Sequence, residues 1–271
     1  MPPPPVPASL QKSIDDTKVE YVQLGTSGLR VSSPILGTMG IGSKQWLEWV
    51  IEKEEGLQVL KMAWDRGLTT WDTANIYSSG VNEEIIGKAI TKFHIPRENL
   101  TLLAKVRGTV PEEPGVFNWM FEDQMAKSKD YMNKGDSPIF NINSTTQSTS
   151  TSIKSHPKSS RGAIFKAVNA SLKRLGTDYI DLLQIHRYYP DVPPAETMKA
   201  LHDLVESGKV RYISTSSMWT YQFASMQFIA EKNGRTKFIS MQNRYNLLYK
   251  EEEREMIRFC KETGVGIIPW G

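Results

Sequence analysis

Short apolar runs alternate with amphipathic stretches along most of the chain, and this alternation predicts strands that are each followed by a helix. The helical period is clear at residues 54–66, where Leu57, Leu60 and Trp64 share one face. We expect seven strands, at residues 35–38, 68–72, 100–105, 179–185, 210–214, 238–242 and 265–269. We expect six helices between them, at residues 54–66, 83–93, 163–175, 195–206, 221–232 and 250–262. Such alternation is typical of parallel βαβ units.

Glycines mark the boundaries of these elements independently of the hydrophobic period. The first two apolar segments, residues 21–24 and 29–32, are joined by a glycine-rich stretch and predict a β-hairpin. Several helices are expected to end at a glycine before the next strand, because glycine adopts the left-handed conformation that ends a helix at little cost. These glycines are Gly67, Gly176, Gly208 and Gly264.

Two architectures fit alternating strands and helices, an open doubly wound sheet and a closed (β/α)8 barrel. No G-x-G-x-x-G motif follows the first strand, which argues against a dinucleotide-binding open sheet. Reactive residues follow several different strands, which favours a barrel with its site at the carboxyl ends of the strands. We therefore predict an α/β fold of the (β/α)8 TIM-barrel type with an N-terminal β-hairpin. Seven of the eight barrel strands precede Gly271, so the sequence is expected to be truncated at its C-terminus.

Two segments depart from this alternation of strands and helices. Residues 141–160 are rich in serine and threonine and could not bury enough apolar surface to fold alone. We expect a low-complexity insert at about residues 122–160, with a substrate-covering lid in the apolar residues just before it as one alternative. The proline-rich residues 1–18 are expected to be a disordered tail, and residues 19–271 one barrel domain.

Composition excludes several classes of protein. Hydrophobic residues make up 39% of the chain and charged residues 23%, as in an ordinary globular protein. The net charge of +3 includes no block of lysine and arginine, so no nucleic-acid partner is expected. No apolar run approaches the roughly 20 residues that span a bilayer, and no signal peptide is present. The single cysteine, Cys260, is expected to be a packing residue. We predict a cytoplasmic protein without a metal site or a membrane partner, and leave its oligomeric state open.

Four residues with proton-transfer chemistry each follow a predicted strand. Asp72 and Tyr77 come after the second strand, Lys105 after the third and His186 after the fourth. Reduction of a carbonyl needs a proton for the developing alkoxide, and the pKa of an ordinary tyrosine lies near 10. A nearby ammonium lowers the pKa of a tyrosine, and a carboxylate can hold that ammonium in place. Each residue alone has an ordinary structural explanation, but together at strand ends they indicate carbonyl chemistry, with His186 orienting the substrate oxygen as a neutral imidazole.

The sequence around these residues resembles the aldo-keto reductase family. The matching segments are Asp72-Thr73-Ala74 with Tyr77, and residues 82–87, 172–181, 184–187, 208–213 and 242–246. The resemblance runs from about residue 21 to residue 270, with a gap across the insert. Within the family, the sequence is most similar in appearance to fungal NADP-dependent oxidoreductases like versiconal hemiacetal acetate reductase.

This resemblance implies an activity and a set of site residues. The implied reaction is the NADPH-dependent reduction of a small aldehyde or ketone to an alcohol, with Tyr77 as the general acid. Lys105 and Asp72 would tune Tyr77, and His186 would orient the substrate. The implied cofactor-binding residues are Gly37, Thr38, Ser216, Ser217, Gln242 and Trp270. Of these, Trp270 would stack on the nicotinamide ring, and Ser216, Ser217 and Gln242 would hold its carboxamide.

The chain also departs from the family pattern. Ser214 stands where a glycine is usual, and its added Cβ could crowd the neighbouring strand or the cofactor, although strand geometry alone does not forbid serine. The family segment that grips the adenosine 2′-phosphate would follow Gly271, so we expect the 271-residue chain to bind NADPH poorly and to turn over little. Two alternatives stay open, a non-enzymatic binding subunit of the potassium-channel β type and an inactive barrel fragment.

Overall fold

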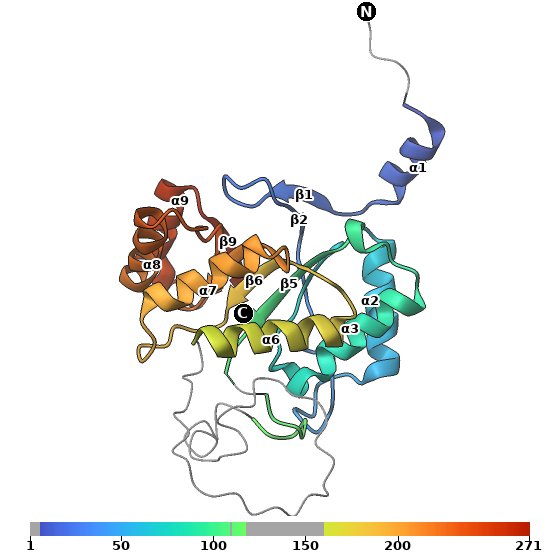
Figure 1. Cartoon of the computed structure of the whole chain (residues 1–271). Coiled ribbons are helices and arrows are strands. Elements are labelled where there is room, and N and C mark those ends of the chain that lie inside the picture. The colour runs from blue at the N-terminus through green and yellow to red at the C-terminus, as the bar shows by residue number, and fades with distance from the viewer. Residues whose placement is uncertain (1–5, 109, 118–159) are drawn as a thin grey trace, which may run out of the picture.

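The computed structural model describes residues 6–108, 110–117 and 160–271. The predicted insert at 122–160 therefore lies outside the described residues, except for its last position, as do residues 1–5 of the predicted tail. Within the described part, helices pack around a central sheet, and a hairpin lies across one end of it (Figure 1).

Seven parallel strands form this sheet in the described part of the chain, and their spatial order is their order in the sequence. They are β3 (Leu36–Gly37), β4 (Thr70–Asp72), β5 (Thr101–Val106), β6 (Ile180–Ile185), β7 (Val210–Ser216), β8 (Ser240–Arg244) and β9 (Gly266–Trp270). A doubly wound sheet would reverse its strand order at some point, and this sheet does not. The fold is of the (β/α)8 TIM-barrel type, as the sequence predicts.

Among the described residues, six helices follow these strands around the outside of the sheet. They are α2 (Lys53–Asp65), α3 (Val81–Lys92), α6 (Arg161–Leu175), α7 (Pro194–Glu206), α8 (Thr220–Lys232) and α9 (Met256–Thr263). Short 3₁₀ helices η1 (Tyr77–Gly80), η2 (Arg97–Asn99) and η3 (Glu251–Glu253) lie between them. One prediction needs correction, because the helix expected at residues 250–262 is divided into η3 and α9. Glu255 interrupts it with a φ of −139°, outside the helical range.

The predicted glycine boundaries are confirmed. Gly67, Gly176, Gly208 and Gly264 all have positive φ, and Gly176 and Gly264 directly cap α6 and α9 in the left-handed conformation.

The N-terminal tail is more ordered than predicted. Residues 8–16 form α1 (Ala8–Asp16), so disorder over residues 1–18 is wrong for this segment. No residue of α1 is buried, and Figure 1 shows the helix projecting away from the sheet. Local interactions account for the helix: the Gln11 amide donates to the Asp15 carboxylate one turn later, and Pro7 precedes the first turn.

The hairpin covers the end of the sheet where the strands begin. It consists of β1 (Glu20–Gln23) and β2 (Arg30–Ser33), which pair antiparallel. Its turn lies against the turn before β9, where a Cβ on Gly25 would come within 2.4 Å of the Gly264 carbonyl oxygen. A side chain at this position is therefore excluded on two grounds, since Gly25 also has a φ of +59°. Leu24 from the hairpin joins Ile268 and other interior residues in one apolar cluster.

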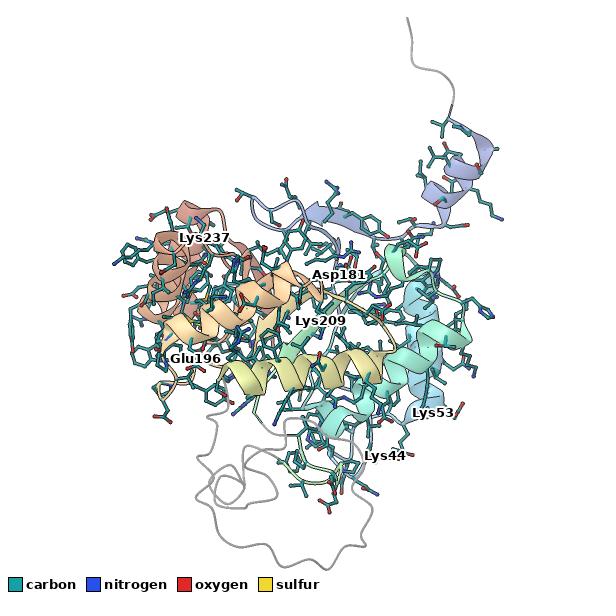
Figure 2. All side chains as sticks on the ribbon, in the orientation of Figure 1. Lys44, Lys53, Asp181, Glu196, Lys209 and Lys237 are labelled. Carbon is teal, nitrogen blue, oxygen red and sulfur yellow. The ribbon has the colours of Figure 1, made fainter. Side chains whose placement is uncertain are left out.

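Charged groups tie this same end of the sheet together. Asp181 of β6 lies near the hairpin in Figure 2 and pairs with Arg97 of η2 at 2.6 Å. Its carboxylate also accepts the Leu102 backbone N–H at 3.0 Å. These contacts of Asp181 join β5, β6 and η2 near the amino ends of the strands. They therefore stabilise the fold and lie away from the carboxyl ends.

Candidate active site

The interior of the sheet changes from apolar to polar along the strands. Alternate residues of a strand share one face, and in β5 these are Leu103 and Lys105, while in β6 they are Leu182 and Gln184. Leu103, Leu182 and Ile268 pack with the hairpin in the apolar cluster. The next interior positions, towards the carboxyl ends, carry amines, amides and hydroxyls. The hairpin end of the barrel is therefore closed by apolar side chains, and the other end carries side chains that can bind polar ligands or transfer protons.

Asp72 and Lys105 form a buried ion pair at this polar level. The Lys105 side chain is 1% exposed, and its ammonium donates both to the Asp72 carboxylate and to the Thr73 carbonyl oxygen. Asp72 is the last residue of β4, and Lys105 lies on the adjacent strand β5. Sequence analysis predicts this pair, and the structure brings the two groups together.

Two glutamines complete the surroundings of the Asp72 carboxylate. Its Oδ1 accepts a hydrogen bond from the Gln184 amide at 2.9 Å and another from the Gln242 amide at 3.0 Å. The carboxylate thus has three donors from three strands, which fixes its orientation towards Lys105. Gln184 is not among the predicted site residues, although it lies two positions before His186 on the same strand face and opposite Lys105 in the strand register. That register could have identified it.

Tyr77 is held by an unusual turn. It begins η1, and the two serines that follow it, Ser78 and Ser79, have φ of 48° and 52°. Non-glycine residues in left-handed conformations cost of order 1–3 kcal/mol each and persist where the surroundings enforce them. Here the Ser43 backbone N–H donates to the Ser78 hydroxyl, and a Cβ on Gly42 would lie 2.1 Å from that hydroxyl oxygen. The close approach of the Gly42 loop therefore holds the turn that presents Tyr77.

The Tyr77 ring lies between the lysine, the histidine and a tryptophan. The Lys105 ammonium is 5.1 Å from the ring centroid, and the His186 ring is 6.1 Å away, edge on at 86°. Trp46 covers another side, with its ring centroid at 6.1 Å. The four predicted catalytic residues therefore converge, from positions that span 114 residues between Asp72 and His186.

The net direction of the Tyr77 pKa differs from the sequence argument. Burial raises the pKa of Tyr77 above its ordinary 10.0, and the positive charge of Lys105 lowers it by less than burial raises it. Lys105 does lower the pKa of Tyr77, as the sequence predicts, but loss of water around the phenolate raises this pKa by more. The phenol therefore keeps its proton at neutral pH. For Lys105, burial lowers the pKa, yet the charge of Asp72 leads the groups that together raise it above 10.5.

His186 is a neutral imidazole. Burial, the positive charge of Lys105 and the charges of two nearby arginines hold the pKa of His186 well below 6.5. Its Nδ1 is buried without a hydrogen-bond partner in the described part of the chain. A neutral ring of this kind can donate a hydrogen bond to a substrate oxygen without carrying charge into the site, as predicted.

The predicted cofactor-binding residues fall into two groups. Gly37, Thr38, Ser216, Gln242 and Trp270 line the same cavity as Tyr77 and His186. Ser217 is not among its lining residues, and its backbone N–H donates to the Asn243 side chain at 3.0 Å, which supports the turn after β7. Thr38 is fully buried, and its hydroxyl donates to the Asp72 carbonyl oxygen, so it fastens β3 to β4.

Ser214 fits its position without crowding the neighbouring strand. It is fully buried between β7 and β8, and its hydroxyl donates to the Ser240 carbonyl oxygen at 2.7 Å. The Ser240 hydroxyl lies at the same distance, 2.7 Å. Strand geometry does permit serine here, because its hydroxyl forms a bridge between the two strands.

The cavity has a volume of about 610 Å³, which is the size of a small-molecule site. Besides the predicted residues, it is lined by Met39, Trp46, Ile76, Arg107, Arg187 and Gly271. Sequence analysis does not predict the two arginines as site residues, although their positions carry a signal. Arg107 follows Lys105 by two residues and continues its strand face, and Arg187 is the residue after His186.

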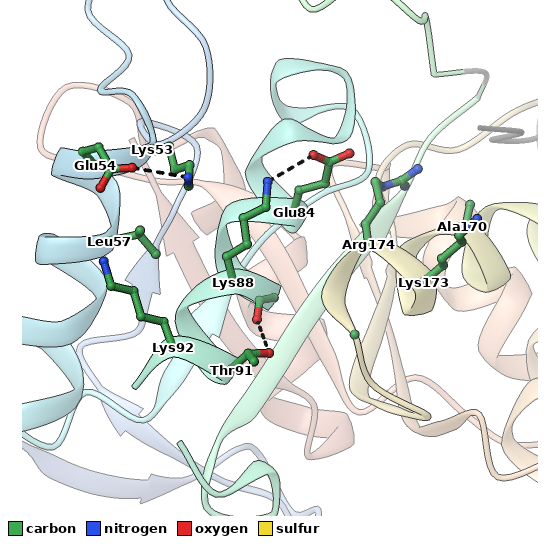
Figure 3. A pocket seen from close by; sticks show the side chains of 12 residues that line it. Lys53, Glu54, Leu57, Glu84, Lys88, Thr91, Lys92, Ala170, Lys173 and Arg174 are labelled. Carbon is green, nitrogen blue, oxygen red and sulfur yellow. Dashed lines mark hydrogen bonds and ion pairs between the residues drawn. The ribbon is translucent and has the colours of Figure 1, made fainter. Parts of the chain in front are cut away.

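Another cavity, of about 750 Å³, lies on the outside between α2, α3 and α6 (Figure 3). Its wall is mainly flexible charged side chains, such as Lys88, which pairs with Glu84 at 3.8 Å, and Lys53, which pairs with Glu54 at 3.3 Å. None of the predicted catalytic residues lines it. The chemistry of the described residues is therefore concentrated in the interior cavity.

The described residues contain neither a membrane-spanning helix nor a cluster of metal-ligating side chains. No helix there has the length and apolar character that crossing a membrane requires. No group of three or more histidine, cysteine, aspartate or glutamate residues there is arranged to hold a metal ion. Cys260 is buried in the core, and burial raises its pKa to about 12, in agreement with a packing role.

The fold and the site define a barrel protein with a tyrosine, a lysine, an aspartate and a histidine around one cavity at the carboxyl ends of its strands. Residues 35–271 match the Aldo/keto reductase family. The chain belongs to the aldo-keto reductase family, whose members are oxidoreductases that act on carbonyl groups.

Individual relatives agree with this assignment. The chain is 51% identical to an aldo-keto reductase of Fusarium vanettenii over 269 residues, which are 98% of this chain and 67% of the relative. It is 45% identical to versiconal hemiacetal acetate reductase of Aspergillus parasiticus, over 93% of this chain and 66% of the relative. A crystal structure of the thermostable aldo-keto reductase Tm1743 with the inhibitor epalrestat superposes with a TM-score of 0.65 at 26% identity, covering 92% of this chain and 71% of that one. The chain thus spans about two thirds of the length of these curated relatives, and the resemblance to the fungal enzymes is confirmed.

Proposed function

We propose that this protein reduces an aldehyde or a ketone to an alcohol, with NADPH as the hydride donor and Tyr77 as the general acid. The observation that carries the proposal is the convergence of Tyr77, the Asp72–Lys105 ion pair and neutral His186 on one cavity of about 610 Å³. The reductase relatives favour this enzyme over the alternatives of a binding subunit or an inactive fragment. A cytoplasmic location and the absence of a nucleic-acid partner stay predictions from the sequence.

The cavity has room and groups for a nicotinamide ring. A Cβ on Gly37 would meet nothing within 4 Å, so the wall at this residue is open to a flat ligand. Trp270 is 40% exposed at the cavity wall and offers an aromatic face, while Gln242 and Ser216 offer polar groups nearby. These residues fit a nicotinamide cofactor, which would supply the hydride when bound. The choice of NADPH over NADH rests on the family resemblance.

The residues of the chain would provide the proton and the orientation. The Tyr77 hydroxyl donates its proton to the substrate oxygen as negative charge develops there. Lys105, whose charge favours the phenolate, stabilises the tyrosine after the proton has left, and Asp72 keeps Lys105 protonated and in place. His186 donates a hydrogen bond to the same oxygen. Trp46 and Ile76 form the apolar part of the wall and exclude water from the reacting groups.

The proposal is tested by following NADPH oxidation against a panel of aromatic and aliphatic aldehydes and ketones, with NADH in parallel. With NADPH supplied at a saturating concentration, we expect measurable turnover of at least one carbonyl class, a preference for NADPH, and the corresponding alcohol as the product by mass spectrometry. Absence of turnover across the panel, with NADPH shown to be bound by fluorescence titration, would contradict the proposal.

The pH dependence of reduction follows from the two pKa directions. Reduction requires protonated Tyr77, and because the pKa of Tyr77 is raised above 10.0, rising pH removes that proton in the alkaline range beyond this value. His186 titrates well below 6.5 and gives no transition near neutrality. We expect kcat/KM for reduction to be flat from about pH 7 to pH 10 and to fall above that. A falling limb centred near neutral pH in a steady-state profile would show that another group controls proton transfer.

A further inference from the structure

Two arginines lie in the wall of the catalytic cavity. Arg187 directly follows His186 at the end of β6, and Arg107 follows Lys105 by two residues at the end of β5. Both line the cavity that contains Tyr77 and His186. None of the proton-transfer steps described above uses either guanidinium group.

Arg187 carries a positive charge that the described residues do not neutralise. Its guanidinium donates to the His186 backbone carbonyl oxygen at 2.6 Å, and it forms no ion pair with a carboxylate in the described part of the chain. The positive charge of Arg107 also reaches it, since burial first and Arg107 second lower the pKa of Arg187. A guanidinium stays charged in proteins. A partly buried cation beside a second cation is unfavourable unless an anion compensates it.

The cavity wall does not supply this anion. Asp72 is the side-chain carboxylate among the lining residues, and its oxygens accept from Lys105, Gln184 and Gln242. Those donors already hold it in place on the Tyr77 side of the cavity. A ligand is therefore the natural source of negative charge at Arg187.

We propose that Arg187 binds a carboxylate carried by the carbonyl substrate, and that Arg107 adds positive charge to the same part of the cavity. This inference rests on the proposed reductase function and deepens it to a substrate class: an aldehyde or ketone with an apolar body and a carboxylate. The planar guanidinium matches a carboxylate with two parallel hydrogen bonds. Trp46 and Ile76 line the same cavity and suit the apolar body.

A phosphate of the cofactor is the other anion that a guanidinium could bind. The residues suited to the nicotinamide ring, Trp270, Gln242 and Ser216, belong to β9, β8 and β7. The arginines follow β5 and β6, the strands that place Lys105 and His186, and so lie beside the proton-transfer residues rather than at β9. This placement favours the substrate, and the affinity for NADPH distinguishes the two sources.

The test compares matched acids and esters in wild type, Arg187→Met and Arg187→Lys. The substrates are 3- and 4-carboxybenzaldehyde and their methyl esters, which differ in charge with similar apolar bodies. Arg66→Met, at an exposed residue that directly follows α2 outside the cavity, is the control and should keep the wild-type ratio of kcat/KM for acid over ester. We expect this ratio to fall about 10- to 100-fold in Arg187→Met, through KM more than kcat, because a charge-assisted hydrogen bond is lost. The acid-to-ester ratio of Arg187→Lys should lie between the ratios of wild type and Arg187→Met.

Three results would overturn the inference. The first is an acid-to-ester ratio that is the same in wild type and Arg187→Met. The second is a preference of the wild type for the ester. The third is a loss of NADPH affinity in Arg187→Met with an unchanged ratio, which would assign the arginine to a cofactor phosphate.

A binding measurement tests the carboxylate site independently of whether the protein is a reductase. If wild type reduces no carbonyl of the panel, the proposed function fails. Quenching of tryptophan fluorescence by 4-carboxybenzaldehyde then measures recognition directly, with Trp46 in the cavity wall as a reporter. Tighter binding of the acid than of the ester in wild type, lost in Arg187→Met, would support the carboxylate site. Equal affinities in both proteins would overturn it.

Discussion

Replacement of Tyr77 by phenylalanine is expected to reduce kcat for carbonyl reduction by about 10²- to 10⁴-fold, the usual contribution of general acid catalysis. The change removes the hydroxyl that would donate the proton and keeps the ring that packs against Trp46 and His186. KM should change little, because His186 and the cavity wall remain. Steady-state kinetics on the best carbonyl of the panel give both constants.

The fold of Tyr77→Phe should be intact, which makes a kinetic loss interpretable. Tyr77 is 8% exposed and packs in a cluster with Trp46, Val50 and Ile76, all of which the phenylalanine ring still contacts. Its thermal unfolding midpoint should stay near that of wild type. Tyr221→Phe on exposed α8 is the matched control and should retain full kcat. If Tyr77→Phe kept more than about a tenth of kcat, the tyrosine could not be the main proton donor.

The strand order of this protein was predictable because its helices end at glycines and its strands are short apolar runs. Gly176 and Gly264 have the left-handed conformation that their positions before strands predict. Hydrophobic periodicity did not predict where a helix is interrupted. At residues 250–262 it predicts one helix, but three consecutive glutamates form η3 and Glu255 separates η3 from α9. The helix α1, which buries none of its residues, was not predicted either.

The convergence of the four proposed catalytic residues was predictable because each follows a strand, and parallel strands bring their carboxyl ends together. Their supporting contacts were not, because these depend on register. Gln184 reaches Asp72 since it lies opposite Lys105 across β5 and β6, and one position along either strand would turn it outward. The sign of the Tyr77 pKa also required the structure, because burial of the phenol outweighs the nearby lysine.

Much of the family signature in this sequence serves the scaffold. The fully buried Asn82 donates to the Thr38 and Ile41 carbonyl oxygens at 2.7 and 2.8 Å and so fixes the loop after β3. The adjacent Glu83, also fully buried, pairs with Arg174 of α6 at 2.7 Å and joins α3 to α6. These motifs therefore identify the family through residues that hold the catalytic loops and helices in place, as well as through the proton-transfer residues.

Breaking the Asp72–Lys105 pair at one side is expected to cost about 3–5 kcal/mol of the free energy of unfolding, because it leaves a buried charge uncompensated. Asp72→Asn is the sharper single variant. Its amide oxygen can still accept hydrogen bonds from Gln184 and Gln242. The change therefore removes the negative charge at residue 72, next to Lys105, and keeps the size and shape of the side chain. The exposed pair of Lys61 and Asp65, 2.6 Å apart, is the matched control, and Asp65→Asn there should cost less than about 1 kcal/mol.

The pH dependence of this stabilisation has a defined sign. The pKa of Lys105 is raised above 10.5 in the folded protein, so the contribution is fully present below 10.5 and is lost as pH rises through the folded pKa. In Asp72→Asn the raising charge is gone while burial stays, so the pKa of Lys105 should fall below 10.5. The variant should therefore lose stability relative to wild type at neutral pH, and the difference should shrink in strongly alkaline buffer.

A double-mutant cycle distinguishes a buried ion pair from general sensitivity of the core. Lys105→Met removes the ammonium and keeps an unbranched apolar chain, so the double variant Asp72→Asn, Lys105→Met contains no unpaired charge at this position. We expect it to be more stable than Asp72→Asn alone, with a coupling energy of about 1–3 kcal/mol in urea unfolding. Lys105→Met and the double variant should lack reductase activity, because Tyr77 then lacks the ammonium beside it. Asp72→Asn should lose activity for another reason, because Lys105 is no longer held in place. Additive losses of stability would mean that the two residues act separately, and retained activity in the double variant would mean that Tyr77 donates its proton without the pair.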